Sequence, residues 1–381
     1  MKKFMALFIA AAMTVSLAAC GNTTDGGNSG SGDSYTSGNT EFVIGGTGPL
    51  TGDASSYGVS VQEGAAIAIE EINANGGLGG VNFKLDMKDD KAAAADAATG
   101  YDMLYEAGMN ISIGSVTSAS CASFAAKAAQ DNVFFITPSA SAADVITNDN
   151  AFRICFGDPD QGVLAAREFK DKYQKIGAIY DTSDTYSSGI YEAFKEEMTN
   201  LSLDFDTQTF DAENKKDFST QVEALKDCDV IFLPIYYTEA GLIAKTAVAK
   251  GSKAVLFGCD GLDGVEGQVD ASVTNKIQYI TPFDAKSAEP ATAAFVEKYT
   301  AKYNKTPDQF AADGYDAVMA IYNAMKAANV SDPTIAPSDL CEKVKAAITD
   351  TSFSYTGATG KMTWDASGAC NKEPTIITLG E

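Results

Sequence analysis

The stretch from Phe42 to Gly77, FVIGGTGPLTGDASSYGVSVQEGAAIAIEEINANGG, decides the fold. It begins with the short apolar run 42–46, which is typical of a buried strand, and continues through a glycine-rich turn. Apolar residues then recur at helical spacing over 57–75, and Asn-Gly-Gly is a plausible end for that helix. The residues that share one helical face are Val61, Ala65, Ile69 and Ile72.

The same alternation of short apolar runs and longer helical runs continues along the chain and restarts after residue 170. Strands separated by helices of this length imply right-handed crossovers and parallel sheets, so two series predict an α/β protein with two doubly wound lobes. The chain crosses between such lobes several times, as a hinge requires. We expect strands at 83–88, 111–116, 133–137, 176–180, 230–235, 254–257 and 277–281, and helices at 92–108, 119–130, 189–200, 239–250, 292–303 and 311–328.

The first twenty residues have the layout of an export signal. Lys2 and Lys3 precede the apolar run Phe4–Leu17, and small residues lead into Cys20. The run is too short for a membrane-spanning helix, which needs about 20 residues. Leu17-Ala18-Ala19-Cys20 resembles the bacterial lipobox, which implies a signal peptide over 1–19 and a lipid on Cys20. The alternative is an ordinary signal anchor with an incidental cysteine.

Residues 20–40 form a lipidated cysteine followed by a polar segment of Gly, Ser, Asn, Thr and Asp. Such a segment buries too little apolar surface to offset its ordering entropy, so we expect a flexible tether. The folded part would then be held at a bacterial cell membrane, outside the cytoplasm, through its N-terminal lipid only.

The charge and residue composition exclude several classes of function. The formal net charge is −23, and removing Lys2 and Lys3 leaves 26 basic against 51 acidic residues, or about −25. This argues against nucleic acid and against direct binding to anionic lipid. The chain has no histidine, which removes the usual general base and the commonest zinc ligand. We therefore expect no enzyme activity, no cofactor and no metal.

Six cysteines remain once Cys20 is assigned to the lipid, and they allow fifteen pairings. The pairing that we favour, weakly, is Cys341 with Cys370, because both lie in the final segment. Buried free thiols are at least an equal alternative.

A set of short motifs, in order along residues 41–381, resembles the type I periplasmic binding proteins, and among them the leucine/isoleucine/valine-type amino-acid receptors of ABC transporters. No single motif decides this, and the ordered set carries the resemblance. The motifs are Ile44 to Gly52, Tyr57-Gly58, Gly64 to Asn73, Asn75-Gly76-Gly77, Lys88-Asp89-Asp90, Ile113-Gly114 through Ser118, Ile136 to Ser141, Tyr186 to Gly189, Lys216 to Ser219, Tyr315-Asp316-Ala317 and Thr363-Trp364-Asp365.

The resemblance implies a protein that binds a small amino acid between its lobes and passes it to ABC transporter permease subunits. We expect a monomer whose first lobe is 41–157 plus 284–356 and whose second lobe is 158–283 plus 357–381. Closure of the lobes about the hinge would enclose the ligand.

The resemblance assigns the ligand carboxylate to Ser118 and Ser141, where the family often has threonine in place of Ser141. Ser118 follows a predicted strand and opens a predicted helix, so its hydroxyl and nearby N–H groups suit an anion. The alternative for Ser118 is a plain helix cap, which is compatible with ligand binding.

An ammonium group needs an anionic partner, since a buried unpaired charge costs several kcal/mol. Asp260 follows a predicted strand and falls where the leucine-type receptors place a glutamate, so the resemblance assigns it this contact. The alternative is a surface turn, because Cys259-Asp260-Gly261 is also good turn chemistry. The carbonyl of Ser139 is the second acceptor that the resemblance implies.

Aromatic side chains complete the predicted site. Tyr57, Tyr186 and Tyr236 match ring positions that line the family's cleft, and Phe310 is a weaker candidate for the side-chain pocket. Asp158 is interpreted as a turn or crossover residue instead of a ligand contact.

Other interpretations stay open or fail on spacing. Gly46-Thr47-Gly48 between a strand and a helix imitates a dinucleotide-binding loop, but the spacing is off by one and Pro49 occupies the loop. The serious alternatives keep the fold. The chain would then bind an amide, an aromatic acid or a short peptide, or present its ligand to a sensor.

Overall fold

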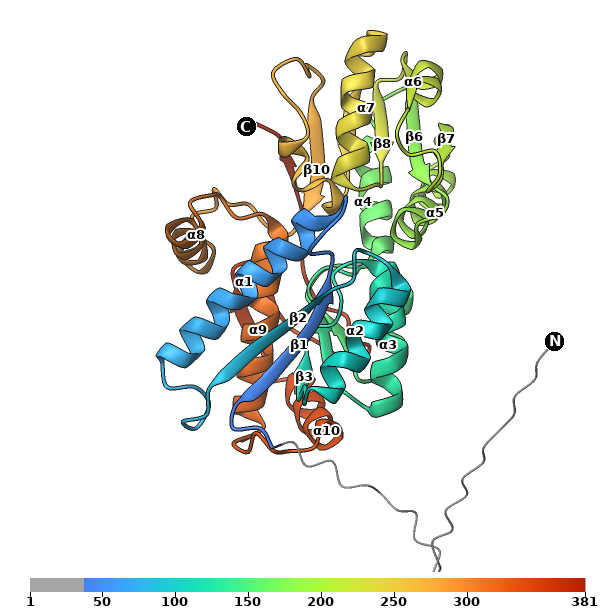
Figure 1. The fold of residues 1–381 in the computed structure, drawn as a ribbon. Coiled ribbons are helices and arrows are strands. Elements are labelled where there is room, and N and C mark those ends of the chain that lie inside the picture. The colour runs from blue at the N-terminus through green and yellow to red at the C-terminus, as the bar shows by residue number, and fades with distance from the viewer. Residues whose placement is uncertain (1–37, 381) are drawn as a thin grey trace, which may run out of the picture. The chain divides into compact units, whose positions relative to one another are not determined.

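The computed structural model describes residues 38–380, and two parallel sheets organise them (Figure 1). The predicted signal peptide and Cys20 lie outside this range, as does the predicted tether apart from its last three residues. Among residues 38–380 no helix is long and apolar enough to cross a membrane.

The first sheet has five parallel strands in the order β2-β1-β3-β4-β5. Helices α1 and α9 cover one face, and α2 and α3 cover the other (Figure 1). From β1 the chain continues to β2 on one side, whereas from β3 it continues to β4 on the other side. The space between β1 and β3 is therefore the switch point, where ligands bind in such folds. The strands are β1 (Phe42–Gly48), β2 (Phe83–Asp89), β3 (Ile111–Ser112), β4 (Phe135–Thr137) and β5 (Ala151–Arg153).

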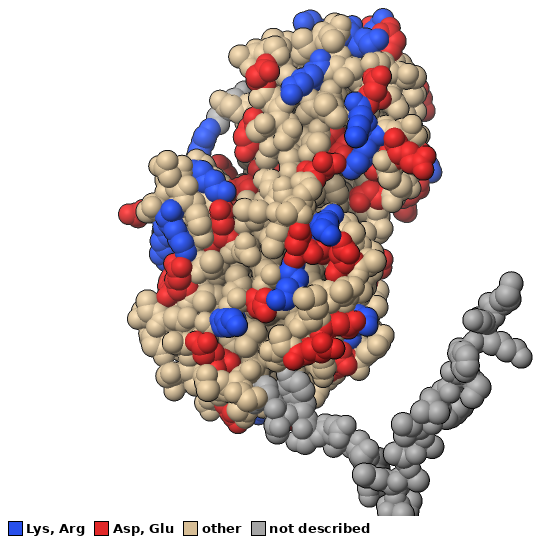
Figure 2. Space-filling view, viewed as in Figure 1, with Lys and Arg blue, Asp and Glu red and all other residues tan. Residues whose placement is uncertain are grey.

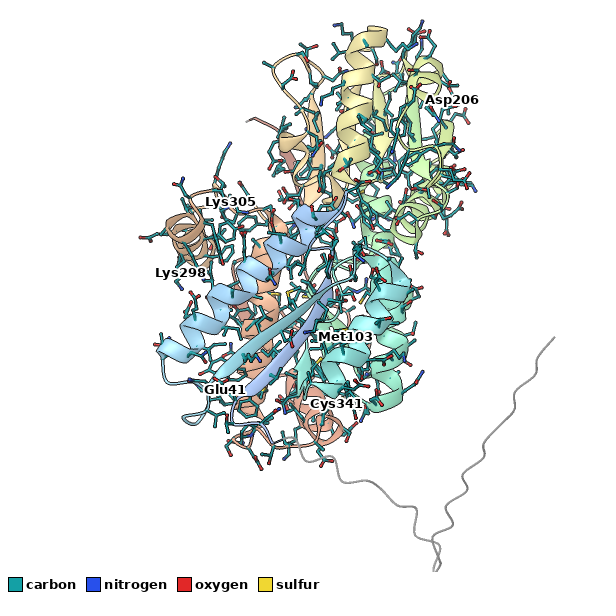
Figure 3. All side chains as sticks on the ribbon, in the orientation of Figure 1. Glu41, Met103, Asp206, Lys298, Lys305 and Cys341 are labelled. Atoms are coloured by element: carbon teal, nitrogen blue, oxygen red, sulfur yellow. The ribbon has the colours of Figure 1, made fainter. Side chains whose placement is uncertain are left out.

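Three helices of this lobe precede the second sheet in sequence, and three lie between the fifth and sixth strands of that sheet. They are α1 (Ser55–Ala74), α2 (Ala94–Glu106), α3 (Ser118–Asp131), α8 (Pro290–Tyr303), α9 (Gln309–Ala327) and α10 (Pro337–Ile348). Ion pairs tie α8 and the turn after it to α1: Lys298 of α8 lies 2.6 Å from Glu71, and Lys305, just past the end of α8, lies 2.8 Å from Glu63 (Figure 3 labels both lysines).

The second sheet has six strands in the order β13-β10-β9-β8-β6-β7, all parallel except the edge strand β13. Helices α4 and α5 pack together, as do α6 and α7. The strands are β6 (Ile176–Asp181), β7 (Asp206–Phe210), β8 (Val230–Leu233), β9 (Val255–Gly258), β10 (Ile277–Thr281) and β13 (Thr375–Thr378), and the helices are α4 (Asp158–Phe169), α5 (Thr185–Asn200), α6 (Ser219–Leu225) and α7 (Tyr237–Lys250).

The observed architecture is the predicted one, two parallel-sheet lobes in a mixed α/β fold, and within residues 38–380 the chain passes between the sheets three times. The third passage follows the hairpin of β11 (Tyr355–Gly357) and β12 (Gly360–Met362). There a buried ion pair joins Lys372 to Asp313 of α9 at 3.2 Å. The exact lobe boundaries stay a prediction.

Two expectations need correction. The predicted strand 111–116 is only two residues long, because Gly114 adopts a positive φ of 63° and the Ser112 hydroxyl binds the Gly114 N–H at 2.8 Å. The favoured Cys341–Cys370 disulfide is wrong, since the six cysteines among the described residues are free thiols. The Cys341 thiol lies on α10 and donates a hydrogen bond to the Asn132 side chain. Cys370 instead pairs with Trp364 through an isolated backbone β-bridge.

The acidic composition is visible on the surface. Figure 2 shows acidic and basic side chains interspersed over the visible face, with no continuous basic surface among the residues coloured there. This face therefore offers no basic patch to a polyanion such as nucleic acid.

Candidate functional site

A small cavity of about 20 Å³ lies between the two sheets, at the carboxyl ends of their parallel strands. Each sheet contributes one side of it, through loops that follow strands and through the first turns of helices. The residues lining it are Tyr57, Val116, Thr117, Ser118, Ser139, Tyr186, Tyr236, Asp260, Gly261 and Phe310.

The structure brings together seven of the eight predicted ligand-binding residues in this cavity. The exception is Ser141, which is fully buried and does not line the cavity. Ser141 instead lies behind it, where its carbonyl accepts hydrogen bonds from the Arg153 guanidinium at 2.5 Å and from the Asp158 N–H at 3.0 Å.

One wall of the cavity is the start of α3. Thr117 occupies the N-cap position, so Ser118 is the first helical residue and the plain-cap alternative does not describe it. The Ser118 hydroxyl accepts from the Ala142 N–H at 3.2 Å, and the Thr117 hydroxyl is buried with no hydrogen-bond partner among the described residues. The N–H groups of a helix start, together with these hydroxyls, favour a negatively charged group.

The opposite wall carries a buried carboxylate. Asp260 begins a 3₁₀ turn after β9 and is only 4% exposed, so the surface-turn alternative is wrong. Its Oδ1 accepts from the Tyr186 hydroxyl at 2.7 Å. Burial raises the pKa of Asp260 to about 6, against the hydrogen bonds from Tyr186 and Gln161. No basic residue lines this cavity, and a cationic group would relieve the cost of this buried carboxylate.

Aromatic rings form the remaining walls. The ring of Tyr57 lies 4.2 Å from that of Phe310 and 5.5 Å from that of Tyr236, and Tyr236 stacks on Tyr186 at 5.1 Å. The Tyr57 hydroxyl accepts from the Tyr237 N–H at 3.1 Å and donates to the Gly261 carbonyl, so it connects the two lobes. The rings therefore present apolar faces to the cavity, while the hydroxyls of Tyr57 and Tyr186 bind protein groups.

Only glycine fits at position 261. A Cβ there would lie 2.7 Å from the Tyr186 hydroxyl and 3.0 Å from the Ile235 carbonyl. The close approach lets the Gly261 N–H donate to Tyr186 at 2.8 Å, which holds that hydroxyl against Asp260.

Sequence reasoning missed a second buried carboxylate. Asp158 is the first residue of α4 and is 1% exposed. The interpretation as a turn or crossover residue did not include this burial. Neither of its carboxylate oxygens has a hydrogen-bond partner of normal geometry among residues 38–380, although Ser141 is near enough to favour the ionised form. Burial, and the nearby charge of Asp260, raise the pKa of Asp158. An Asp-Pro pair reads as a turn in sequence, and nothing local indicates burial.

A second, larger cavity of about 330 Å³ shares Tyr236 with the first and is lined by both charged and apolar side chains. Lys215 lies 3.5 Å from Asp53 and 3.3 Å from Glu239, which places an ion pair between the lobes. Burial raises the pKa of the nearby Asp184 to about 6. Among the described residues no group of acidic or cysteine side chains has the arrangement of a metal site.

Comparison with known proteins agrees with this geometry. The family model for periplasmic binding proteins matches residues 41–376. A Leu/Ile/Val-binding protein homolog of Brucella melitensis is 26% identical over 339 residues, which is 85% of this chain and 90% of that protein.

Two solved structures have the same fold. A leucine-binding protein of Thermotoga maritima has a TM-score of 0.80 and 27% identity, and a branched-chain amino-acid transporter substrate-binding protein of Streptococcus pneumoniae, in complex with isoleucine, has 0.80 and 29%. Each alignment covers 89% of this chain and 96% of the other. The chain therefore belongs to the periplasmic binding proteins of type I.

Proposed function

We propose that this chain is the extracytoplasmic, lipid-anchored binding protein of an ABC importer and that it carries a small amino acid of the branched-chain kind. The observation that carries the proposal is the buried carboxylate of Asp260 facing a helix start across an aromatic cavity. A zwitterion with an apolar side chain needs these three surroundings. The leucine- and isoleucine-binding relatives support the choice of ligand.

The roles follow from the chemistry of each wall. The ligand carboxylate would bind the Ser118 hydroxyl and the N–H groups at the start of α3, with Thr117 beside it. The ammonium would bind Asp260 and the Ser139 carbonyl, and Asp158 supplies further negative potential. The apolar side chain would lie against Tyr57 and Phe310, which wall the cavity.

Delivery completes the proposal. The Leu17-Ala18-Ala19-Cys20 motif supports lipidation at Cys20, and the family supports permease subunits as partners of the closed protein. We propose that the protein acts as a monomer and reaches the permease while its lipid keeps it at the membrane.

The test is a thermal-shift screen of ligand-free protein against the common amino acids, followed by calorimetry on each hit. A ligand that binds only the folded state stabilises it by about 2.7 kcal/mol when its concentration is 100 times Kd. The melting temperature rises as a result. We expect leucine, isoleucine or valine to bind, and Asp260→Ala to lose at least about 100-fold in affinity, from a loss of about 3 kcal/mol.

Asp206→Ala is the matched control, because Asp206 is an exposed acid on β7 that does not line the cavity (Figure 3). It should bind as the wild type does. A folded, ligand-free protein that responds to no amino acid would overturn the proposed ligand class. Binding of an aromatic acid, an amide or a peptide in its place would keep the fold-level assignment and change the solute.

A further inference from the structure

The main chain of Asp260 is held on both sides by glutamine side chains. Its N–H donates to Gln161 Oε1 at 3.0 Å, and its carbonyl accepts from Gln309 Nε2 at 2.6 Å. Gln161 lies on α4 and Gln309 is the first residue of α9, and both are at most 1% exposed. The orientation of the Asp260 carboxylate therefore depends on two elements that are distant in sequence.

Gln309 makes further bonds to the same region. Its N–H donates to Asp263 Oδ2 at 2.7 Å, and its Oε1 accepts from the Thr281 hydroxyl at 3.0 Å. Asp260, Asp263 and Thr281 all belong to the chain segment that forms the six-stranded sheet, whereas α9 packs on α1 at the five-stranded sheet. Gln309 thus bonds from one lobe to the other with both ends of its amide.

The residue after Gln309 lines the cavity. Phe310 packs on Tyr57 from α1, so the aromatic wall and the Gln309 contacts share one helical turn of α9. Any shift of the Asp260 turn relative to this wall would change the distance between the carboxylate and the rings. Gln309 donates a hydrogen bond directly to the Asp260 carbonyl, and it lies on the same helix, α9, as Phe310.

We propose that Gln309 is a positioning residue that holds the Asp260 turn in register with the Tyr57–Phe310 wall. The ligand-binding part of this inference depends on the proposed function, and the ordering of the turn does not. An amide is required, because one end must donate to the Asp260 carbonyl while the other accepts from Thr281. An ionised glutamate has no donor for the carbonyl, and a leucine has neither donor nor acceptor.

The groups around position 309 are mainly acidic or phenolic, and one basic residue, Lys305, acts on the neighbouring Asp308. Asp260 and Asp263 bond Gln309 directly, Asp308 precedes it, and Tyr279 donates to Asp263 at 3.2 Å. Glu266 adds negative charge near Asp263 and Asp308. These carboxylates and burial would raise the pKa of the new glutamate, so acidification would return the proton that donates.

The test compares Gln309→Leu, Gln309→Glu and the control Gln278→Glu, whose parent side chain is half-buried on β10 and donates to Thr378. Hydrogen exchange of residues 259–264 is measured in ligand-free protein, and calorimetry measures L-leucine and L-alanine binding. We expect Gln309→Leu to speed exchange in this turn about 5-fold, as the loss of one hydrogen bond predicts, and to weaken binding of whichever probe the wild type binds by about 10-fold or more. Exchange within 312–324 and in the control should match the wild type.

Gln309→Glu should show the same losses at pH 8.5, and they should ease relative to the wild type at pH 5.5. A glutamate that stays protonated throughout would leave only Gln309→Leu impaired, which also supports a required donor. Wild-type exchange in the turn of Gln309→Leu would overturn the inference, as would a loss in Gln309→Glu that acidification does not ease. A wild-type protein that binds no amino acid would overturn the proposed function alone, since the exchange measurement still decides the role of Gln309.

Discussion

At the scale of single residues, the site is built around the buried carboxylate of Asp260, in a cavity that no basic residue lines. Asp260 and Asp158 are both buried, and after burial itself the charge of Asp260 raises the cost of ionising Asp158. The side chain that bonds the Asp260 carboxylate is neutral, the hydroxyl of Tyr186. Buried groups of this kind are costly to stability and are typical of functional sites, because the ligand supplies the missing partner.

The titration of Asp260 predicts how binding depends on pH. Its pKa is about 6 in the ligand-free fold, against 3.8 ordinarily, and an ammonium ligand favours the ionised form. Affinity should therefore be constant above pH 7 and fall toward 10-fold per pH unit below pH 6. Calorimetry from pH 5 to 8 measures this, with Asp260→Asn expected to bind weakly and without that slope.

The same shift has the opposite effect on the ligand-free protein. Between pH 3.8 and about 6 the folded state holds a proton on Asp260 that the unfolded state releases, so this group's contribution to the free energy of unfolding falls as pH rises through that window. Burial raises the pKa of Asp158 as well, so a slope of the free energy of unfolding with pH that remains in Asp260→Asn should shrink in the double variant with Asp158→Asn. A wild-type affinity that does not change between pH 5 and 8 would contradict the role of Asp260.

At the scale of elements, two glycines set the distance between α1 and α9. A Cβ on Gly64 would lie 1.8 Å from the Ala311 carbonyl oxygen, and one on Gly314 would lie 2.4 Å from the Val61 carbonyl oxygen. The helices therefore touch through their backbones. This contact brings Tyr57 and Phe310, each in the first turn of its helix, into the ring contact that walls the cavity.

Gly64→Ala tests this packing. Alanine favours an isolated helix by about 1 kcal/mol over glycine, but the overlap with Ala311 should lower the free energy of unfolding by about 2 kcal/mol. Urea denaturation measures the change. Gly267→Ala is the control, because a Cβ there has open space, and its effect should stay within about 0.5 kcal/mol. A stabilised Gly64→Ala variant would show that the helices separate without cost.

At the scale of the whole described chain, three passages connect the sheets, and side chains close the space between them. The Thr238 hydroxyl donates to the Asp53 carbonyl at 2.9 Å, beside the Lys215–Asp53 ion pair. Exposed pairs of this kind contribute at most about 1 kcal/mol each, so a ligand with more affinity for the closed form can decide the equilibrium.

Ligand binding should therefore reduce the radius of gyration in small-angle scattering. The physical reason is that Ser118 and Asp260 belong to different lobes, so under the proposed function one small molecule would contact both only when the lobes approach. Asp260→Ala at the same ligand concentration is the control and should keep the ligand-free radius. An unchanged radius in saturated wild-type protein would count strongly against hinge closure.

Local sequence was sufficient for most of the elements. The long periodic helices and the apolar strands such as β8 and β10 were predicted because their patterns report burial directly. The strand β7, DTQTF, and the helix α4, which opens with Asp-Pro-Asp, were not predicted. Their residues are polar or turn-forming, and only the neighbouring elements make them a strand and a helix.

The sequence by itself determined the α/β alternation, the two lobes and the residues that follow each strand, because periodicity and turn chemistry are local properties. Tertiary structure alone decided that Asp158 is buried beside Asp260, that Ser141 lies behind the cavity, and that Gln161 and Gln309 hold the Asp260 main chain. Burial and hydrogen-bond partners depend on distant segments meeting in space, as Gln161 and Asp260 do although they are 99 residues apart, and no local pattern encodes that meeting.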